Sequence, residues 1–318
     1  MSRRVITAAA LCLLVPLLAA GCATGGSRTA PASRQSTSAQ AGTGPYPVAV
    51  HAANGDVSVR KRPSRIVSLS PSLTEMLYAI GAGKQVVAVD NQSDYPRSAP
   101  RTKLSGFKPN VEAIAGYDPD LVVLSFDTNH VLSGLGKLSI PVYQGPAAKK
   151  LQGTYRQITQ LGRLTGHLDR ARHLALRMKR HIKKIAARAP HHKPPLTYYH
   201  ELDPSLHAMT SKSFIGQVYQ LAGLRNIADP ADKSGRGFTQ LSAEYVIEKN
   251  PDLIFLADSQ CCGQSTRTVA KRPGWSHVTA VRRGNVFVLD PDISSRWGPR
   301  VVDFLRAVVR AVNHAETG

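Results

Sequence analysis

The amino-acid sequence predicts two α/β lobes with parallel-type sheets, joined by a single long helix. Three observations support this fold class. Short apolar runs alternate with short helical segments over residues 47–150, as in a parallel sheet with crossover helices. A strong helical period follows over 151–190, and a second alternation fills 191–318. A chain of 318 residues with 42% hydrophobic content is long enough to bury a substantial core.

The first lobe is expected to begin with a hairpin over 47–60, because the turn Asn54-Gly55-Asp56 separates two alternating apolar runs. Four short apolar runs then have the composition of strands, at 65–69, 86–89, 121–124 and 141–143. Three helical segments accompany them, at 72–80, 111–115 and 132–138. Gly81 and Gly83 are expected to stop the first helix, since glycine readily adopts the conformation that ends a helix.

The segment 151–188 places apolar or small residues in steps of three and four, which define one buried helical face. We expect Gly162 and Gly166 to break it into two helices. The second, over about 167–188, would be about 33 Å long at the usual rise per residue. It carries eight Lys and Arg residues against Asp169 alone, which accounts for +7 of the formal net charge of +20.

The second lobe repeats the alternation of strands and helices. Strands are expected at 196–199, 252–256 and 286–289. Helices are expected at 213–222, 242–248 and 299–313, the last of them amphipathic.

The N-terminal residues predict export. Residues 1–21 have the features of a lipoprotein signal peptide, because Arg3 and Arg4 precede an apolar run that is too short for a membrane span. The run ends in Leu-Ala-Ala-Gly-Cys, which resembles a bacterial lipobox with Cys22 as the lipidated residue; an ordinary signal peptide is the alternative. Residues 22–46, rich in Ser, Thr, Gly and Ala, predict a flexible tether. We expect the folded body at the outer face of the cell membrane.

The basic excess raises nucleic acid and anionic membrane as partners. No base-reading motif or interleaved aromatic residue accompanies the basic run at 167–188, so we expect no nucleic-acid partner and a solvated surface near anionic lipid. No G-x-S-x-G, Walker or H-E-x-x-H motif is present, and Gly81-Ala82-Gly83-Lys84 follows a predicted helix where a phosphate loop would follow a strand. The chain is therefore not expected to be an enzyme.

Two adjacent cysteines, Cys261 and Cys262, follow the strand expected at 252–256. An oxidising compartment permits a vicinal disulfide between them. Loops at the carboxyl ends of parallel strands line ligand crevices, so this loop either shapes a cleft, contacts a soft metal, or serves only as a structural loop.

Several segments occur together in one order. Residues 65–81 read RIVSLSPSLTEMLYAIG. Further segments in the first lobe are SDYP at 93–96, NVEAI at 110–114 and PDLVV at 119–123. Those in the second lobe are Ala222-Gly223, Asn226-Ile227, LSAE at 241–244, NPDLI at 250–254, PGW at 273–275 and GPR at 298–300. As a set, from about residue 63 to 312, they resemble class III periplasmic binding proteins, the vitamin B12 and iron-siderophore receptors of ABC importers.

The resemblance implies a fold and a role. The two lobes would be joined by one rigid helix and would move little, with a bulky metal chelate held between them. The chelate would be cobalamin, a ferric siderophore or haem, delivered to an ABC permease and its ATPase. The chain would have no cofactor and no resident metal of its own, and we expect a monomer.

The resemblance also implies ligand-binding residues. The vitamin B12 receptor pattern places an aromatic residue before 241–244, where Phe238 stands, and an Asp and an Arg before the last helix, at Asp292 and Arg296. Arg296 has the donors to pair with phosphate, carboxylate or amide groups, or else caps a loop and pairs at the surface. Trp297 adjoins them. Tyr199 is expected on a cleft wall at a strand end.

In the first lobe the aromatic candidates are Phe107, which core packing would also explain, and Phe126. Here the sequence departs from the vitamin B12 pattern, because Ser125-Phe126 stands where that pattern has a Trp. The family docks on its permease through one acid in each lobe. Glu244 matches the second-lobe acid, and Asp127 is the candidate in the first.

Two other readings stay open at this point. An α/β enzyme at the cell surface would need a nucleophile and base that no motif supplies. A basic module for anionic polymers or membrane would need its charge gathered into one working patch.

Overall fold

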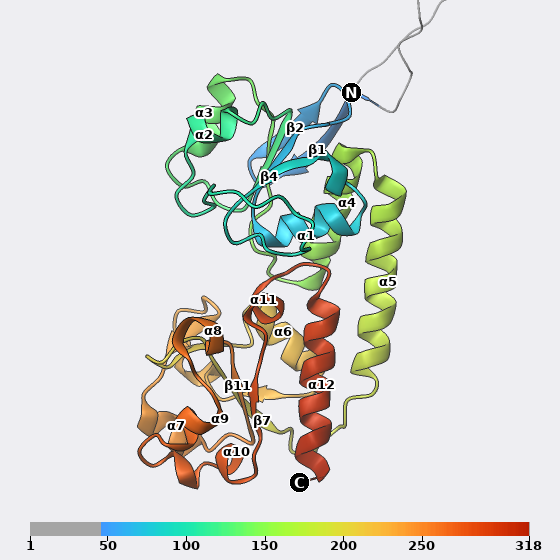
Figure 1. Ribbon diagram of the computed structural model, residues 1–318. Coiled ribbons are helices and arrows are strands. Elements are labelled where there is room, and N and C mark those ends of the chain that lie inside the picture. Colours follow the sequence, from blue (N-terminus) through green and yellow to red (C-terminus); the bar gives the residue numbers. More distant parts are fainter. Residues whose placement is uncertain (1–45, 318) are drawn as a thin grey trace, which may run out of the picture. The chain divides into compact units, whose positions relative to one another are not determined.

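The structure is a computed structural model that describes residues 46–317. The predicted signal peptide (1–21), the predicted lipidation site Cys22 and the tether up to residue 45 lie outside the described residues. Figure 1 shows two lobes, each built on its own sheet, with long helices running alongside them.

The first lobe contains a four-stranded parallel sheet in the order β4-β3-β5-β6. Its strands are β3 (Ile66–Leu69), β4 (Val86–Val89), β5 (Leu121–Leu124) and β6 (Val142–Gln144). Every residue of β3 and β5 is buried, as expected for central parallel strands covered on both faces. The predicted hairpin is present as β1 (Val48–Ala52) and β2 (Gly55–Val59).

The helices of this lobe are α1 (Pro71–Ala79), α2 (Val111–Ala115) and α3 (Val131–Lys137). Gly81, at a φ of +89°, and the short 3₁₀ turn η1 (Gly83–Gln85) follow α1, so the glycine-rich segment does stop a helix.

The linking segment forms α4 (Leu151–Thr165) and α5 (Leu168–Ala186). Gly166 ends α4 with a φ of +75°, as predicted, but the predicted break at Gly162 is wrong. A Cβ at Gly162 would lie 2.3 Å from the Cβ of Ala171, so this glycine lets α4 and α5 approach closely. The closing helix α12 (Val301–Thr317) packs against α5. One buried apolar cluster runs through these helices and includes residues from both lobes.

The second lobe has a mixed sheet in the order β10-β8-β7-β11-β12, with β9 beside β7. Strands β7 (Thr197–Glu201), β11 (Leu253–Leu256), β12 (Val286–Val288) and β9 (Arg225–Asn226) are parallel. Strand β8 (His207–Met209) runs antiparallel to both β7 and β10 (Phe238–Gln240). The parallel-type sheet predicted for this lobe is therefore confirmed, and β8 and β10 add an antiparallel part at one side of it.

The other helices of the second lobe are short. They are α6 (Phe214–Leu221), α7 (Ala243–Lys249), α8 (Ser259–Cys262), α9 (Thr266–Ala270), α10 (Thr279–Arg282) and α11 (Pro291–Ser295), with 3₁₀ turns η2 (Asp229–Ala231) and η3 (Trp275–His277). Within residues 46–317, none of the helices combines the length and apolar character needed to cross a membrane.

Candidate functional site

A cavity of about 310 Å³ lies where the first-lobe sheet faces α11 and the segment that follows it in the second lobe. Three of its lining residues, Ser70, Asp90 and Ser125, each follow directly after a parallel strand, β3, β4 and β5 respectively. Carboxyl ends of parallel strands meet at one edge of a sheet, which is where α/β folds bind ligands. The second lobe contributes Asp292, Ser295, Arg296 and Trp297.

A larger hollow of about 820 Å³ lies elsewhere, between the hairpin and α4. Its lining residues run from His51 to Gln160, so the second lobe contributes nothing to it. Only the smaller of the two cavities joins residues from both lobes, and it also contains five of the seven ligand residues predicted from the sequence.

Two phenylalanines of the first lobe line the cavity. Phe107 is 68% exposed and Phe126 is 47% exposed, both unusual for large apolar rings. Their ring centroids lie 6.5 Å apart and their planes differ by only 19°. The alternative in which Phe107 belongs to the core is therefore excluded. Two nearly parallel exposed rings suit the flat face of a ligand.

Some of the polar residues that line the cavity belong to a network of buried hydroxyls. The Ser125 Oγ donates to the Ser70 Oγ at 2.7 Å, and the Thr74 Oγ1 lies 2.9 Å from the Ser93 Oγ. The Ser93 hydroxyl donates to the Asp90 carboxylate. Burial raises the pKa of Asp90 to about 6, against the opposing effects of the Ser93 hydrogen bond and the Arg296 charge. The members of this network that line the cavity, Ser70, Ser125 and Asp90, thus offer hydrogen-bonding oxygens and one acid.

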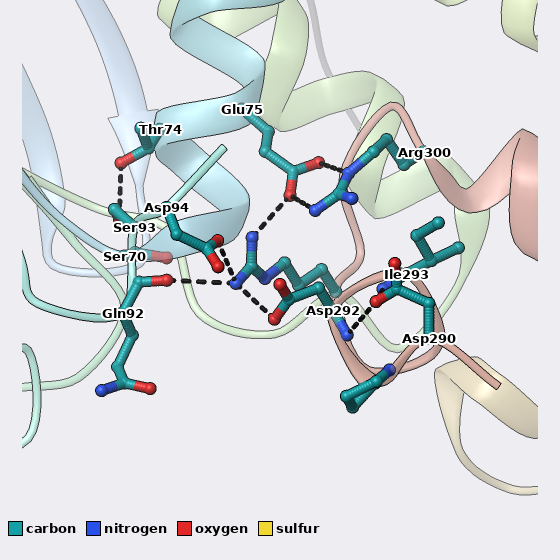
Figure 2. Close-up of polar contacts among 12 residues, drawn as sticks. Ser70, Thr74, Glu75, Gln92, Ser93, Asp94, Asp290, Asp292, Ile293 and Arg300 are labelled. Atoms are coloured by element: carbon teal, nitrogen blue, oxygen red, sulfur yellow. Dashed lines mark hydrogen bonds and ion pairs between the residues drawn. The ribbon is translucent and has the colours of Figure 1, made fainter. Parts of the chain in front are cut away.

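Five charged residues link the lobes next to this network, and we call them the interlobe ion cluster: Glu75, Asp94, Asp292, Arg296 and Arg300. The Arg296 Nη1 donates to the Glu75 Oε1 at 3.0 Å, and its Nη2 contacts Asp94 at 2.9 Å and Asp292 at 2.6 Å. The Arg300 guanidinium holds both oxygens of Glu75, at 2.6 and 3.1 Å. Figure 2 shows Glu75 facing Arg300, with Asp94 and Asp292 turned towards each other.

The pKa values of the two aspartates in the cluster, Asp94 and Asp292, are shifted in opposite directions. Burial acts to raise the pKa of Asp94, but hydrogen bonding and the charge of Arg296 lower it overall. Burial raises the pKa of Asp292, and the neighbouring Asp94 charge adds to this effect. The two carboxylates therefore compete for one end of a single guanidinium.

This arrangement changes the interpretation of Arg296. Its side chain lines the cavity but is only 8% exposed, and four acceptors on the protein already engage its two terminal nitrogens. The guanidinium therefore joins the lobes, and both of its terminal nitrogens are hydrogen-bonded to the protein. Sequence reasoning missed Glu75, Asp94 and Arg300; the available signal was an acid, Glu75, on the apolar face of a predicted helix.

The other predicted aromatic residues lie in different places. Trp297 lines the cavity and donates its Nε1–H to Gln157 at 2.9 Å. The prediction that Tyr199 lies on the cleft wall is wrong. Its side chain is fully buried, with its ring against Trp275 in the second-lobe core. Strand β7 continues to Glu201, so Tyr199 is not at the strand end. Phe238 is 47% exposed on the edge strand β10 and is not among the residues lining the cavity.

The adjacent cysteines form a disulfide, Cys261–Cys262, at the end of α8. Neither lines the cavity. Beside them, Glu201 accepts two 2.6 Å hydrogen bonds from Arg272. Asp258 is buried, and burial together with the charge of Glu201 raises its pKa to about 7. The two carboxylates, Glu201 and Asp258, are buried in the second lobe, whereas both cysteines are exposed.

The two predicted docking acids are both exposed, one on each lobe. Asp127 lies between β5 and α3, where its carboxylate accepts the Leu132 N–H at 3.1 Å. Glu244 lies in the first turn of α7, and hydrogen bonds from its own backbone N–H and from Ser242 lower its pKa.

Comparison with known proteins gives three main similarities. Residues 66–293 match the family of periplasmic binding proteins. The chain is 30% identical over 311 residues to an uncharacterized ABC transporter substrate-binding lipoprotein, YvrC, of Bacillus subtilis, covering 94% of each chain. It is 29% identical over 272 residues to a cobalamin-binding protein of Halobacterium salinarum, covering 83% of this chain and 73% of that protein.

Among solved structures, the vitamin B12 binding protein BtuF of Vibrio cholerae aligns with a TM-score of 0.67 at 25% identity, covering 81% of this chain and all of that one. A haem-binding protein, RhuT of a Roseiflexus species, aligns with a TM-score of 0.69 at 22% identity, covering 79% of this chain and 99% of that one. At that identity, the haem-binding protein supports the fold alone.

Proposed function

Because the chain belongs to the periplasmic binding protein family, whose members are binding proteins and not enzymes, we propose that it is the lipid-anchored receptor of an ABC importer for a metal chelate, and that this chelate is a corrinoid. The observation that carries the proposal is the cavity itself. Two nearly parallel phenylalanine rings of the first lobe and the Asp292–Trp297 segment of the second line the same space.

The donor atoms of the cavity argue against haem. Haem iron is held in proteins by His, Cys, Met or Tyr side chains. Among the described residues that line the cavity, none is of these four types. A corrinoid brings its cobalt with an axial ligand already bound, so it needs no such donor from the receptor.

The charge of the cavity argues against a strongly anionic ferric chelate. Its lining cation, Arg296, is paired with Glu75, Asp94 and Asp292, and two acids, Asp90 and Asp292, also line the space. Carboxylate and hydroxyl oxygens accept hydrogen bonds from amide N–H groups. The periphery of a corrinoid carries such amides, whereas a polycarboxylate or catecholate chelate would meet repulsion.

The proposal is tested by titrating the chain with cyanocobalamin, haemin and a ferric catecholate in a calorimeter. We expect saturable binding of cyanocobalamin with a Kd of about 1 μM or tighter, roughly −8 kcal/mol, and at least about tenfold weaker binding of the other two. A tighter complex with haemin would refute the corrinoid assignment, and no binding of any chelate would refute the receptor role.

The two tryptophans of the chain allow ligand binding to be followed by fluorescence, with one of them as a control. Trp297 lines the cavity, and Trp275 is buried in the second-lobe core. Ligand-induced quenching of fluorescence is therefore expected to come from Trp297. It should largely disappear in Trp297→Phe, while Trp275→Phe should keep it.

We also propose that Glu244 and Asp127 are the acids that dock the two lobes on the permease. Both are exposed and neither lines the cavity. Glu244→Ala is therefore expected to leave chelate affinity unchanged within about twofold but to lower uptake by the permease about tenfold, the size of effect seen for a lost interface charge.

The matched control for docking is Glu248→Ala, which removes an exposed acid from the same helix. Glu248 pairs with Lys249 at 2.8 Å, and we expect its replacement to leave uptake near the wild-type rate. Normal uptake by Glu244→Ala would remove this residue from the docking surface.

A further inference from the structure

The exposed side of α5 and the turn after it carry many basic residues. Its exposed Lys and Arg residues, which we call the basic face, are Arg170, Arg172, Arg177, Lys179, Arg180, Lys183, Lys184 and Arg188. The single acid in this segment, Asp169, lies 3.6 Å from Arg172. The basic face therefore keeps a large uncompensated positive charge.

The packing of α5 fixes the direction of this face. Its buried residues, Ala171, Leu174, Ala175, Met178 and Ile182, occupy one side of the helix, which packs against α4 and α12. The charged residues fall on the other side by helical periodicity. Leu176 lies among them at 50% exposure, with Arg172 and Arg180 one turn away on either side. Basic residues around an exposed apolar side chain are typical of helices that lie on anionic membranes.

The start of the described chain is attached next to this face. The Tyr46 hydroxyl donates to the Leu164 carbonyl oxygen at 2.9 Å. Arg62 donates to the Thr165 carbonyl oxygen at 3.0 Å and contacts His167, the residue before α5, at 2.8 Å. Tyr46, the first described residue, therefore lies at the N-terminal end of α5.

We propose that the basic face of α5 rests on anionic lipid headgroups of the membrane that carries the protein. The proposal rests on the lipid anchor of the proposed function, which would hold this end of α5 near the bilayer. Screening limits such attraction to about 8 Å at physiological salt, so closeness to the surface is what makes the charge effective. No residue of α5 lines the ligand cavity, so membrane contact and ligand capture use separate surfaces.

The test uses the full lipidated chain in vesicles. Leu176→Cys is labelled with a fluorophore, and quenching by nitroxide-labelled headgroups is compared between neutral phosphatidylcholine vesicles and vesicles with about 30% phosphatidylglycerol. We expect quenching to be at least about fivefold greater on the anionic vesicles. It should return to the neutral level at about 1 M NaCl, where the screening length falls to about 3 Å.

Two charge variants of the labelled chain make the test specific. The α5 variant replaces Arg177, Arg180, Lys183 and Lys184 by Gln and is expected to lose the additional quenching. The matched variant replaces four exposed cations of the second lobe, Lys233, Arg236, Lys271 and Arg282, by Gln, and is expected to keep it. Both should retain chelate binding, because none of the eight positions lines the cavity.

The outcomes separate this inference from the proposed function. A chain that fails to float with vesicles at high salt would lack the lipid anchor, which overturns the proposal at its premise while leaving chelate binding to stand. An anchored chain with equal quenching on both vesicles, or an unchanged response of the α5 variant, would overturn the membrane contact itself. A response to soluble heparin but not to anionic vesicles would assign the face to a polymer and overturn the lipid partner.

Discussion

Arg296→Met is expected to lower the free energy of unfolding by about 3–5 kcal/mol, the range for removing one partner of a buried ion pair. The substitution leaves Glu75 with Arg300 alone and leaves Asp94 and Asp292 facing each other without their shared cation. Because Asp94 is partly exposed, most of the loss should come from the buried Glu75 and from the severed contact between the lobes. Urea denaturation of wild type and variant at pH 7 measures the change.

Arg306→Met is the matched control. Arg306 pairs with Asp303 on the exposed side of α12, and removal of such a surface pair should cost about 0–1 kcal/mol. Arg296→Lys keeps the charge without the two-pronged geometry and should be intermediate, since a lysine cannot reach all four acceptors as a planar fork. A loss below about 1 kcal/mol for Arg296→Met would mean that solvent already compensates these charges and that the guanidinium is available to a ligand.

The ion cluster also marks the limit of what the sequence could predict. Arg296 was identified by its position before the closing helix, but Glu75 lies 221 positions away along the chain. No local pattern reports a contact of that separation. An acid on an apolar helical face indicates that a cation is buried beside it. The sequence alone does not indicate which of the chain's many Lys and Arg residues is that cation.

The fold was predicted well where periodicity is long or apolar runs are continuous. The buried strands β3, β5 and β11 and the helix α5 were all located from such patterns. The short strands β8 and β10 were missed because three residues are too few to show an alternation. Tyr199 was misplaced for a related reason: the polar residues His200 and Glu201 hid the last part of β7, although both are buried.

Replacing both cavity phenylalanines, Phe107→Ala with Phe126→Ala, is expected to weaken chelate binding by about 100-fold or more, roughly 3 kcal/mol. The rings lie 6.5 Å apart and within 19° of parallel, so a flat macrocycle would contact both at once. Stability should change by less than about 1 kcal/mol, because both side chains are largely exposed and their loss leaves no cavity in a core. Calorimetric titration with cyanocobalamin, paired with urea denaturation, separates the two effects.

Phe238→Ala is the matched control, since Phe238 is as exposed as Phe126 but does not line the cavity. If the ligand lies where the first-lobe strands end, the Kd of this variant should be within about threefold of the wild-type value. This corresponds to a change in binding free energy of less than about 1 kcal/mol. The opposite result, a large loss for Phe238→Ala and none for the double variant, would move the ligand to the edge of the second-lobe sheet. The two single variants of Phe107 and Phe126 decide whether the rings act together: a shared planar ligand makes their effects non-additive, whereas two independent contacts would simply add.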